Sequence, residues 1–371
     1  MLVGVPKEIK GHEYRVGLVP ASVRELVHHG HEVIIEAGAG LGIGLGDEAY
    51  RAAGARIVDK AAEIFATSEM VVKVKEPQPQ ECRALRDDQI LFTYLHLAAD
   101  RDQTEALMRS RCVAVAYETV TDQHGRLPLL SPMSEVAGRM SVQVGAHYLE
   151  KMQGGGGVLL GGVPGVHAAK VVVLGGGVSG TNAIRMAMGM EAQVYVIDKS
   201  LERLYELDLQ FGAMLNTVFS TVDSIEQHVA TADLVIGAVL VPGAAAPKLI
   251  TRDMIRKMRP GSVFVDIAID QGGCAETSRP TTHSEPVYQV DGVIHYCVTN
   301  MPGAVARTST FALNNATLPF ALALADKGYR KALQDDPHLA NGLNIIHGKI
   351  TYEAVAKSLR LPFTPLKQAV A

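Results

Sequence analysis

The chain alternates between short apolar runs and segments in which apolar residues recur every three or four positions. MLVGV at 1–5 and HEVIIEA at 31–37 are apolar runs, and ASVRELVHHG between them has helical periodicity and ends at Gly30. The same alternation continues through MVVKV at 70–74 and VAVAYE at 113–118. Continuous apolar strands separated by helices predict a parallel sheet that is covered on both faces.

The alternation breaks after the first third of the chain and resumes at residue 170. Ser131 and Pro132 are typical of a helix start, and the long helix that they begin ends at the glycines of 154–157. A second alternating set begins with KVVVLG, and a further long helical stretch runs from about 304 to 327. The pattern therefore predicts two α/β segments that are separated and followed by long helices.

These two sets predict an α/β protein with two doubly wound domains. The last forty or so residues hold one clear helix, ITYEAVAKSLRL, and are too few for a third domain. We expect them to pack on the N-terminal domain, which makes that domain discontinuous. The predicted boundaries are 1–128 and 305–371 for the discontinuous domain and 129–304 for the domain inserted in it.

Composition agrees with an ordinary soluble protein of two domains. The chain has 371 residues, 47% apolar and 20% charged, with a formal net charge of −4. It has no basic block, so nucleic acid is not an expected partner. The longest apolar run, at 234–246, is too short to span a bilayer and contains Pro242, which argues against a membrane partner and favours the cytoplasm. No metal site is expected either, because the cysteines are far apart and lack CxxC or His spacing, namely Cys82, Cys112, Cys274 and Cys297.

The segment KVVVLGGGVSGTNA carries a glycine pattern that is typical of dinucleotide binding. Gly175, Gly177 and Gly180 form G-x-G-x-x-G directly after a strand and at the start of a helix. These glycines allow a tight turn, close approach to a pyrophosphate and close packing of helix on strand, and the helix N-terminus attracts the phosphates. The alternative is a glycine-rich turn in a βαβ unit that binds no ligand. The strand that follows argues against this alternative.

That next strand, AQVYVID, ends in Asp198, 18 residues after Gly180. An acid at this position is expected to meet the ribose hydroxyls of the nucleotide. The inserted domain is therefore predicted to be a Rossmann domain that binds NAD, since a carboxylate would repel the 2′-phosphate of NADP. Lys199 and Arg203 nearby weaken this preference slightly.

Polar residues end several predicted strands, where ligands of doubly wound sheets bind. They are Lys75, His96, Glu118, Asp270 and Asn300, and Arg15 follows the first strand. Each one alone has a structural alternative: a core histidine, a surface pair of Lys75 with Glu76, or a turn cap at Asp270. As a set, two cations could hold a carboxylate and a histidine could move a proton. This set predicts hydride transfer between NAD and a small carboxylate, with Lys75 as one half of a carboxylate clamp.

Several long motifs resemble those of the alanine dehydrogenase/transhydrogenase family over nearly the whole chain. They are VPKEIKGHEYRVGLVP, KVKEP, LHLA, PLLSPMSEVAGR, LGGGVSGTNA, VIGAVLVPG, DIAIDQGGCAETSRPTT and NMPGAVARTST. The resemblance implies reversible oxidative deamination of L-alanine to pyruvate and ammonia with NAD. It also implies that the discontinuous domain binds substrate and that the protein is a homo-hexamer.

The same resemblance assigns roles to individual residues. Arg15 and Lys75 hold the substrate carboxylate, His96 is the acid/base, and Asp270 is the second catalytic group in a cleft between the domains. Asn300 is placed beside the nicotinamide ring. The other positions implied to line the NAD site, besides Gly175, Gly177 and Gly180, are Ser134, Val178, Ser179, Asp198, Arg203, Ser220, Val239, Leu240, Ile267, Asp270, Val298 and Met301.

Three other functions are compatible with this fold. The NAD-binding component of a proton-translocating transhydrogenase passes hydride to a partner subunit and uses no small substrate. A related amino-acid dehydrogenase could act on lysine-derived substrates, and a non-catalytic protein could respond to NAD without turnover. Which of His96 and Asp270 moves the proton in each step is left open.

Overall fold

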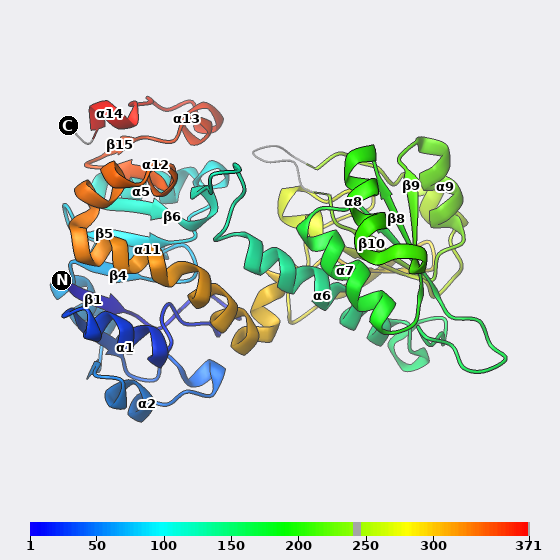
Figure 1. The fold of residues 1–371 in the computed structure, drawn as a ribbon, viewed down its shortest axis with the longest axis horizontal. Helices are drawn as coiled ribbons and strands as arrows, with labels where there is room; N and C mark the ends of the chain where they lie inside the picture. Colours follow the sequence, from blue (N-terminus) through cyan, green and yellow to red (C-terminus); the bar gives the residue numbers. More distant parts are fainter. Residues whose placement is uncertain (240–245, 370–371) are drawn as a thin grey trace. The chain divides into compact units, whose positions relative to one another are not determined.

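The computed structural model describes residues 1–239 and 246–369, and these fall into two compact units (Figure 1). Unit 1 comprises Met1–Met133 and Val305–Ala371, and unit 2 comprises Ser134–Ala304. Each unit is built around a mostly parallel sheet. The predicted α/β class, with a Rossmann domain inserted in a discontinuous domain, is confirmed.

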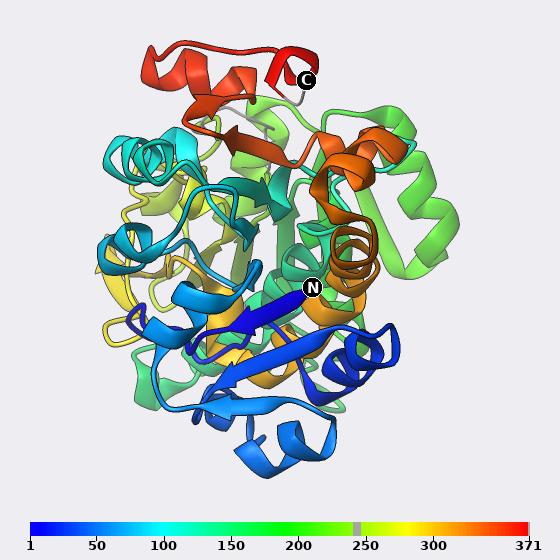
Figure 2. The ribbon, with the colours of Figure 1, turned by 90° about the vertical axis from the view of Figure 1, so that its left-hand side faces the viewer.

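Unit 1 has a sheet with the strand order β15-β14-β6-β5-β4-β1-β2-β3. Pairing is parallel from β3 to β6, whereas β14 and β15 add to the β6 edge in antiparallel fashion. The last part of the chain therefore extends the sheet begun by the first hundred residues (Figure 2). The strands are β1 (Leu2–Val5), β2 (Glu32–Glu36), β3 (Arg56–Val58), β4 (Met70–Val72), β5 (Ile90–Thr93), β6 (Val113–Ala116), β14 (Leu343–Ile346) and β15 (Lys349–Ile350).

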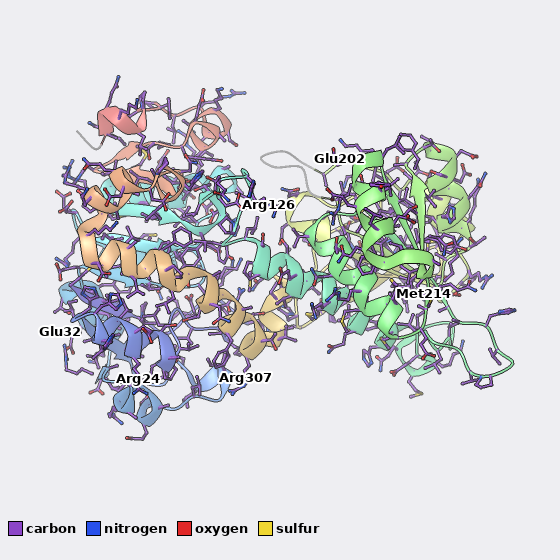
Figure 3. The ribbon with its side chains drawn as sticks, in the orientation of Figure 1. Arg24, Glu32, Arg126, Glu202, Met214 and Arg307 are labelled. Carbon is purple, nitrogen blue, oxygen red and sulfur yellow. The ribbon has the colours of Figure 1, made fainter. Side chains whose placement is uncertain are left out.

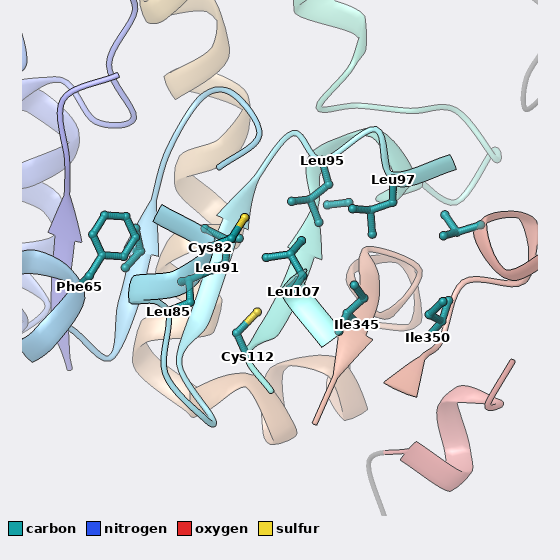
Figure 4. Packing of buried hydrophobic residues seen from close by; sticks show 14 of the residues in the cluster. Phe65, Cys82, Leu85, Leu91, Leu95, Leu97, Leu107, Cys112, Ile345 and Ile350 are labelled. Carbon is teal, nitrogen blue, oxygen red and sulfur yellow. The ribbon is translucent and has the colours of Figure 1, made fainter. Parts of the chain in front are cut away.

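Helices cover this sheet, and an apolar core fills the space beneath them. Figure 4 shows Leu91 on β5, Leu107 on α5, Cys112 before β6 and Ile345 on β14 packed together. Arg307, labelled in Figure 3, lies in the first turn of the long helix α11 and donates to the carbonyl of residue 43. The helices are α1 (Pro20–His28), α2 (Asp47–Ala52), α3 (Ala61–Thr67), α4 (Pro79–Ala84), α5 (Arg101–Ser110), α11 (Ala306–Asp335), α12 (Pro337–Ala340), α13 (Glu353–Leu359) and α14 (Leu366–Ala369).

Unit 2 has a sheet with the order β12-β13-β11-β10-β7-β8-β9. Pairing is parallel except between β12 and β13, and the order reverses between β7 and β10, as in a Rossmann fold. The strands are β7 (Lys170–Leu174), β8 (Gln193–Asp198), β9 (Leu215–Phe219), β10 (Leu234–Gly237), β11 (Val263–Asp266), β12 (Val287–Val290) and β13 (Val293–Tyr296). The helices are α6 (Ser131–Tyr148), α7 (Val178–Gly189), α8 (Leu201–Phe211), α9 (Val222–Ala230) and α10 (Arg252–Lys257).

The strands β4 and β11 are shorter in the structure than in the pattern. β4 ends at Val72, because the backbone N–H groups of Val74 and Lys75 donate to the Glu8 carboxylate at 2.6 and 3.4 Å. β11 ends at Asp266, and a 3-10 turn that contains Asp270 follows it. The pattern also missed β9, which lies at the sheet edge and is mostly half-buried or exposed, so it lacks a continuous apolar run.

In the part of the chain that the structure describes, we find no helix with the length and apolar character needed to cross a membrane.

Candidate active site

The carboxyl ends of the parallel strands of unit 1 bring the predicted substrate residues to one edge of the sheet. Arg15 follows β1, Lys75 follows β4 and His96 follows β5. Strand order reverses between β1 and β4, and this reversal is the place where doubly wound sheets bind ligands. The topology therefore places Arg15, Lys75 and His96 at the expected binding edge.

Arg15 is a buried cation whose orientation is fixed by Glu13. Its Nε and Nη2 donate to the two carboxylate oxygens of Glu13 at 2.7 and 2.6 Å, and the Arg15 side chain is 1% exposed. Burial acts to lower the pKa of Arg15, but the Glu13 carboxylate outweighs it and holds the pKa above its ordinary value. Nη1 donates to the sulfur of Met133 at 3.1 Å, which is a weak acceptor. Sequence analysis missed Glu13, although its position two residues before Arg15 was a usable signal.

The lysine that is buried at the end of β4 is Lys73, not Lys75. Lys73 is fully buried, and its Nζ donates to Glu8 at 3.0 Å and to Glu81 at 2.8 Å. Burial acts to lower the pKa of Lys73, but the two carboxylates outweigh it and raise the pKa. This triad ties the loop after β1 to the loop after β4.

Lys75 lies just beyond this triad, with its side chain 13% exposed. Its backbone is held on both sides, by the Glu8 carboxylate and by the Thr93 hydroxyl, which donates to the Lys75 carbonyl at 3.0 Å. The Lys75 Nζ lies 4.0 Å from the Glu76 carboxylate. Burial acts to raise the pKa of Glu76, but the charges of Lys75 and Lys10 hold it below the ordinary value.

His96 has a left-handed backbone conformation and an accessible ring. Its φ is 52°, a conformation that is uncommon for residues other than glycine and is found at functional sites. The Glu118 carboxylate stabilises this turn by accepting the backbone N–H groups of Leu95 and His96 at 3.2 and 2.6 Å. The imidazole stacks on Tyr94 with 5.8 Å between ring centroids, and its side chain is 47% exposed. A histidine held in this way can present a ring nitrogen to a ligand.

In unit 2 the glycine-rich segment forms the turn between β7 and α7. Gly175 has φ 96°, and a Cβ on Gly180 would lie 1.9 Å from the Gly175 carbonyl oxygen. Gly180 accepts no side chain because α7 packs directly on the turn, and Gly175 accepts none because of its φ and because a Cβ there would lie 2.8 Å from the Ala238 carbonyl oxygen. A Cβ on Gly177 would meet no atom within 4 Å, so its surroundings are open to a ligand.

Asp198 and Arg203 lie beside this turn. Asp198 ends β8 and accepts the backbone N–H groups of Gly176 and Ser200 at 2.7 and 2.9 Å. Arg203 on α8 donates to the Gly176 carbonyl and to the Thr181 hydroxyl, both at 2.7 Å. Glu202, labelled in Figure 3, precedes it in the first turn of the same helix. The carboxylate is thus held where the ribose of a dinucleotide is expected, and Arg203 braces the turn.

Asp270 is exposed in the 3-10 turn after β11, and a buried acid shapes that turn. Asp266 is fully buried and accepts from the N–H of Ala268 at 3.0 Å and of Cys274 at 2.9 Å. Burial raises the pKa of Asp266. Sequence analysis missed this residue, although VFVD, an apolar strand that ends in an acid, was a usable signal.

The other predicted cofactor residues of unit 2 follow its strands or begin its helices. Asn300 follows β13 with φ 60°, and its carbonyl lies 3.1 Å from the His283 ring. Leu240 lies outside the described residues. The rest are Ser134 in α6, Val178 and Ser179 in the first turn of α7, Ser220 after β9, Val239 after β10, Ile267 in the 3-10 turn, and Val298 and Met301 after β13. The described residues include no group of three or more His, Cys, Asp or Glu side chains that could hold a metal ion.

An inserted Rossmann unit with a dinucleotide turn, and a doubly wound unit with a cationic edge, define a two-domain NAD-linked dehydrogenase. Residues 4–137 match the family model described as "Alanine dehydrogenase/PNT, N-terminal domain", and residues 141–353 match "Alanine dehydrogenase/PNT, C-terminal domain". The chain therefore belongs to the alanine dehydrogenase/PNT family, which confirms the predicted family.

Relatives and solved structures match over nearly the full length. An alanine dehydrogenase from Halomonas elongata is 61% identical over 363 residues, which cover 98% of each chain. A solved structure of an L-alanine dehydrogenase is 55% identical, with a TM-score of 0.94 over 97% of this chain and 99% of its own. A solved transhydrogenase structure from Sinorhizobium meliloti is 27% identical, with a TM-score of 0.83 over 94% of this chain and 100% of its own.

Proposed function

We propose that this chain catalyses the reversible NAD-dependent oxidative deamination of L-alanine to pyruvate and ammonium. The predicted enzyme class, an alanine dehydrogenase, agrees with relatives of that name that are 61% and 55% identical over 98% and 100% of this chain. The observation that carries the proposal is the convergence of Arg15, Lys75 and His96 on the switch-point edge of unit 1. This edge supplies two cations and a proton carrier for a small carboxylate.

The unit 2 residues fit NAD. The turn at Gly175 and Gly180 leaves no room for side chains, and Asp198 can accept from a ribose hydroxyl. When bound, NAD accepts the hydride that leaves the alanine Cα. We assign 129–304 to cofactor binding, and 1–128 with 305–371 to substrate binding and catalysis. The residues proposed to contact NAD are Ser134, Gly175, Gly177, Val178, Ser179, Gly180, Asp198, Arg203, Ser220, Val239, Leu240, Ile267, Asp270, Val298, Asn300 and Met301.

Arg15 and Lys75 are proposed to hold the substrate carboxylate. Glu13 occupies the Nε and Nη2 side of the Arg15 guanidinium, while Nη1 donates to the thioether sulfur of Met133. A carboxylate oxygen is a far stronger acceptor than the Met133 sulfur, so substrate would gain by replacing it. Lys75 would add a second, more compact positive charge to the same carboxylate.

His96 and Asp270 are proposed to move the protons. Loss of hydride from alanine leaves an iminium carbon, to which water adds while one of these groups accepts the water proton. The same group, or the other, then protonates the departing amine. Imidazole suits both steps because its ordinary pKa lies close to neutrality.

The test is an assay of NADH formation with a panel of L-amino acids, together with the reverse reaction from pyruvate and ammonium. We expect alanine to be the best substrate, with weaker activity on serine or 2-aminobutyrate. NADH binding without turnover would contradict the proposal, and hydride transfer to a second nucleotide alone would favour the transhydrogenase alternative. His96→Ala should lower kcat by about 10²- to 10⁴-fold. His28→Ala, at an exposed histidine on α1, is the control.

Lys75→Ala tests the clamp separately from the chemistry. We expect the KM for alanine and pyruvate to rise while the Kd for NADH stays nearly constant. Loss of NADH binding in this variant would instead place Lys75 in the cofactor site.

The assembly and location are also proposals. The family resemblance supports a homo-hexamer in the cytoplasm. Light scattering on the purified chain tests the first, and a stable mass below that of six chains would contradict it.

A further inference from the structure

The loop that carries Arg15 is held in place by a side chain from the distant helix α11. Asn314 accepts at Oδ1 from the N–H of Val19 at 2.9 Å and from the hydroxyl of Ser22 at 3.0 Å. Its Nδ2 donates to the carbonyl of Gly17 at 3.2 Å, across 297 residues of sequence, and to that of Thr310 at 3.1 Å. One buried amide therefore joins the end of this loop to the start of α1.

The hydrogen-bonding capacity of Asn314 is used in full. A primary amide has two N–H donors and two acceptor positions on its oxygen, and each has a partner here. The side chain is 1% exposed, so water cannot replace a missing partner. The orientation of the amide is fixed, because two donors face one end and two carbonyls face the other.

The opposite side of the loop is equally constrained. A Cβ on Gly17 would lie 2.4 Å from the carbonyl oxygen of Val72, so the loop backbone packs directly on the end of β4. The hydroxyl of Tyr50, which is fully buried, donates to the Leu18 carbonyl at 3.1 Å. Residues 17–19 are thus fixed between β4, Tyr50 and Asn314, and Arg15 lies two residues before this fixed segment.

We propose that Asn314 is a positioning residue for substrate carboxylate binding, because it sets the place of Arg15 through Gly17 and Val19. The inference rests on the proposed role of Arg15 in the clamp. A shift of about 1 Å in a binding group can cost about a hundredfold in activity. A change that moves Arg15 would weaken carboxylate binding in the ground state and transition state alike, so it would raise KM and leave kcat nearly unchanged.

The test compares Asn314→Asp with Gln89→Glu. Both replace a buried amide of unit 1 with a carboxyl of nearly the same shape, and Gln89 lies just before β5, at the amino end of that strand. The Gln89 amide donates to the carbonyls of Phe65 and Ser68 and accepts from the N–H of Arg86, so its partners lie outside the Arg15 loop. For Asn314→Asp we expect the KM for pyruvate to rise about 10- to 100-fold, with kcat and the Kd for NADH nearly constant. Gln89→Glu should lower the melting temperature without this change in KM.

A milder pair of variants covers the case in which Asn314→Asp does not fold. Ser22→Ala removes one hydrogen bond to the Asn314 amide, and Tyr50→Phe removes the bond to Leu18. Each should raise the KM for pyruvate several-fold, with kcat retained. The inference would be overturned if these variants had lower melting temperatures but an unchanged KM for pyruvate. Inactivity of the unaltered chain toward alanine, or an unchanged KM in Arg15→Lys, would instead refute the proposed function or the clamp.

Discussion

Lys73→Met tests the buried charge triad after β4. The variant keeps an unbranched side chain one atom shorter, but it leaves the carboxylates of Glu8 and Glu81 without the cation that lies 3.0 and 2.8 Å away. The three side chains are 0%, 2% and 4% exposed, so water screens them little. Breaking a buried ion pair costs about 3–5 kcal/mol, and we expect unit 1 to lose about this much stability near pH 8.

The pH dependence follows from the raised pKa of Glu8. Burial raises this pKa even while Lys73 and the N–H of Val74 oppose the shift. A carboxyl whose pKa is higher in the folded than in the unfolded state contributes most to folding stability below its unfolded pKa. That contribution is lost as the pH rises through the folded pKa. Removal of Lys73 should raise the folded pKa further, so the deficit should shrink as pH falls from 8 toward 5. In the unaltered chain the raised pKa of Lys73 keeps its ammonium group charged across this range.

Urea unfolding followed by circular dichroism measures the effect, since the chain has no Trp. With an m value of about 3 kcal/mol per molar, the midpoint should fall by about 1–2 M. The triple variant Lys73→Met/Glu8→Gln/Glu81→Gln should recover most of the loss, because no charge is left buried. Lys257→Met removes an exposed partner of Glu226 and should leave the midpoint nearly unchanged. The reasoning would be refuted if the urea midpoint of Lys73→Met were as close to that of the unaltered chain as the midpoint of Lys257→Met. It would also be refuted if the loss of unfolding free energy in Lys73→Met did not change with pH.

Other features of the structure lead to further measurable outcomes. Gly180→Ala should lower the melting temperature, because its Cβ would clash with the Gly175 carbonyl. Gly177→Ala should fold normally and weaken NADH binding. Equal melting temperatures of the two variants would contradict this expectation. Asp198→Ala should raise the KM for NADH about tenfold or more, because a charge-assisted hydrogen bond to the ribose is lost, and it should narrow the preference for NADH over NADPH. An unchanged ratio of kcat/KM for NADH to kcat/KM for NADPH would exclude a role of Asp198 in ribose binding. Burial raises the thiol pKa to about 11 in Cys82 and about 12 in Cys112 and Cys297, so a thiol reagent at pH 8 should label the native chain slowly and the denatured chain at once. Rapid labelling of native protein would show that these thiols are not buried as described.

Local patterns predicted the parts of the molecule that depend on neighbours in sequence. The turn at Gly175–Gly180 was recognised because strand, glycines, helix and Asp198 follow one another within one βαβ unit. His96 was found because a polar residue directly after an apolar strand must lie at the sheet edge. In both cases the topology of a parallel sheet converts sequence order into position.

The partners of these residues could not be predicted, because they depend on contacts between distant segments. Lys73 and Lys75 lie two residues apart and so have the same place in the strand alternation, and the positions of Glu8 and Glu81 distinguish the buried lysine. Asn314 lies in a long helical stretch whose pattern gives no sign of the loop that it holds. The early ends of β4 and β11 have the same origin, since Glu8 and Asp266 take over backbone N–H groups that pairing strands would otherwise bind.

The pairing of β14 with β6 has a consequence for biosynthesis. Unit 2 is continuous in sequence, whereas the sheet of unit 1 stays unfinished until residues 343–350 are made. Until then the apolar strand Val113–Ala116 presents an open edge to other nascent chains. We therefore expect a polypeptide that ends before residue 343 to have an incomplete first sheet and to aggregate more readily than the full chain.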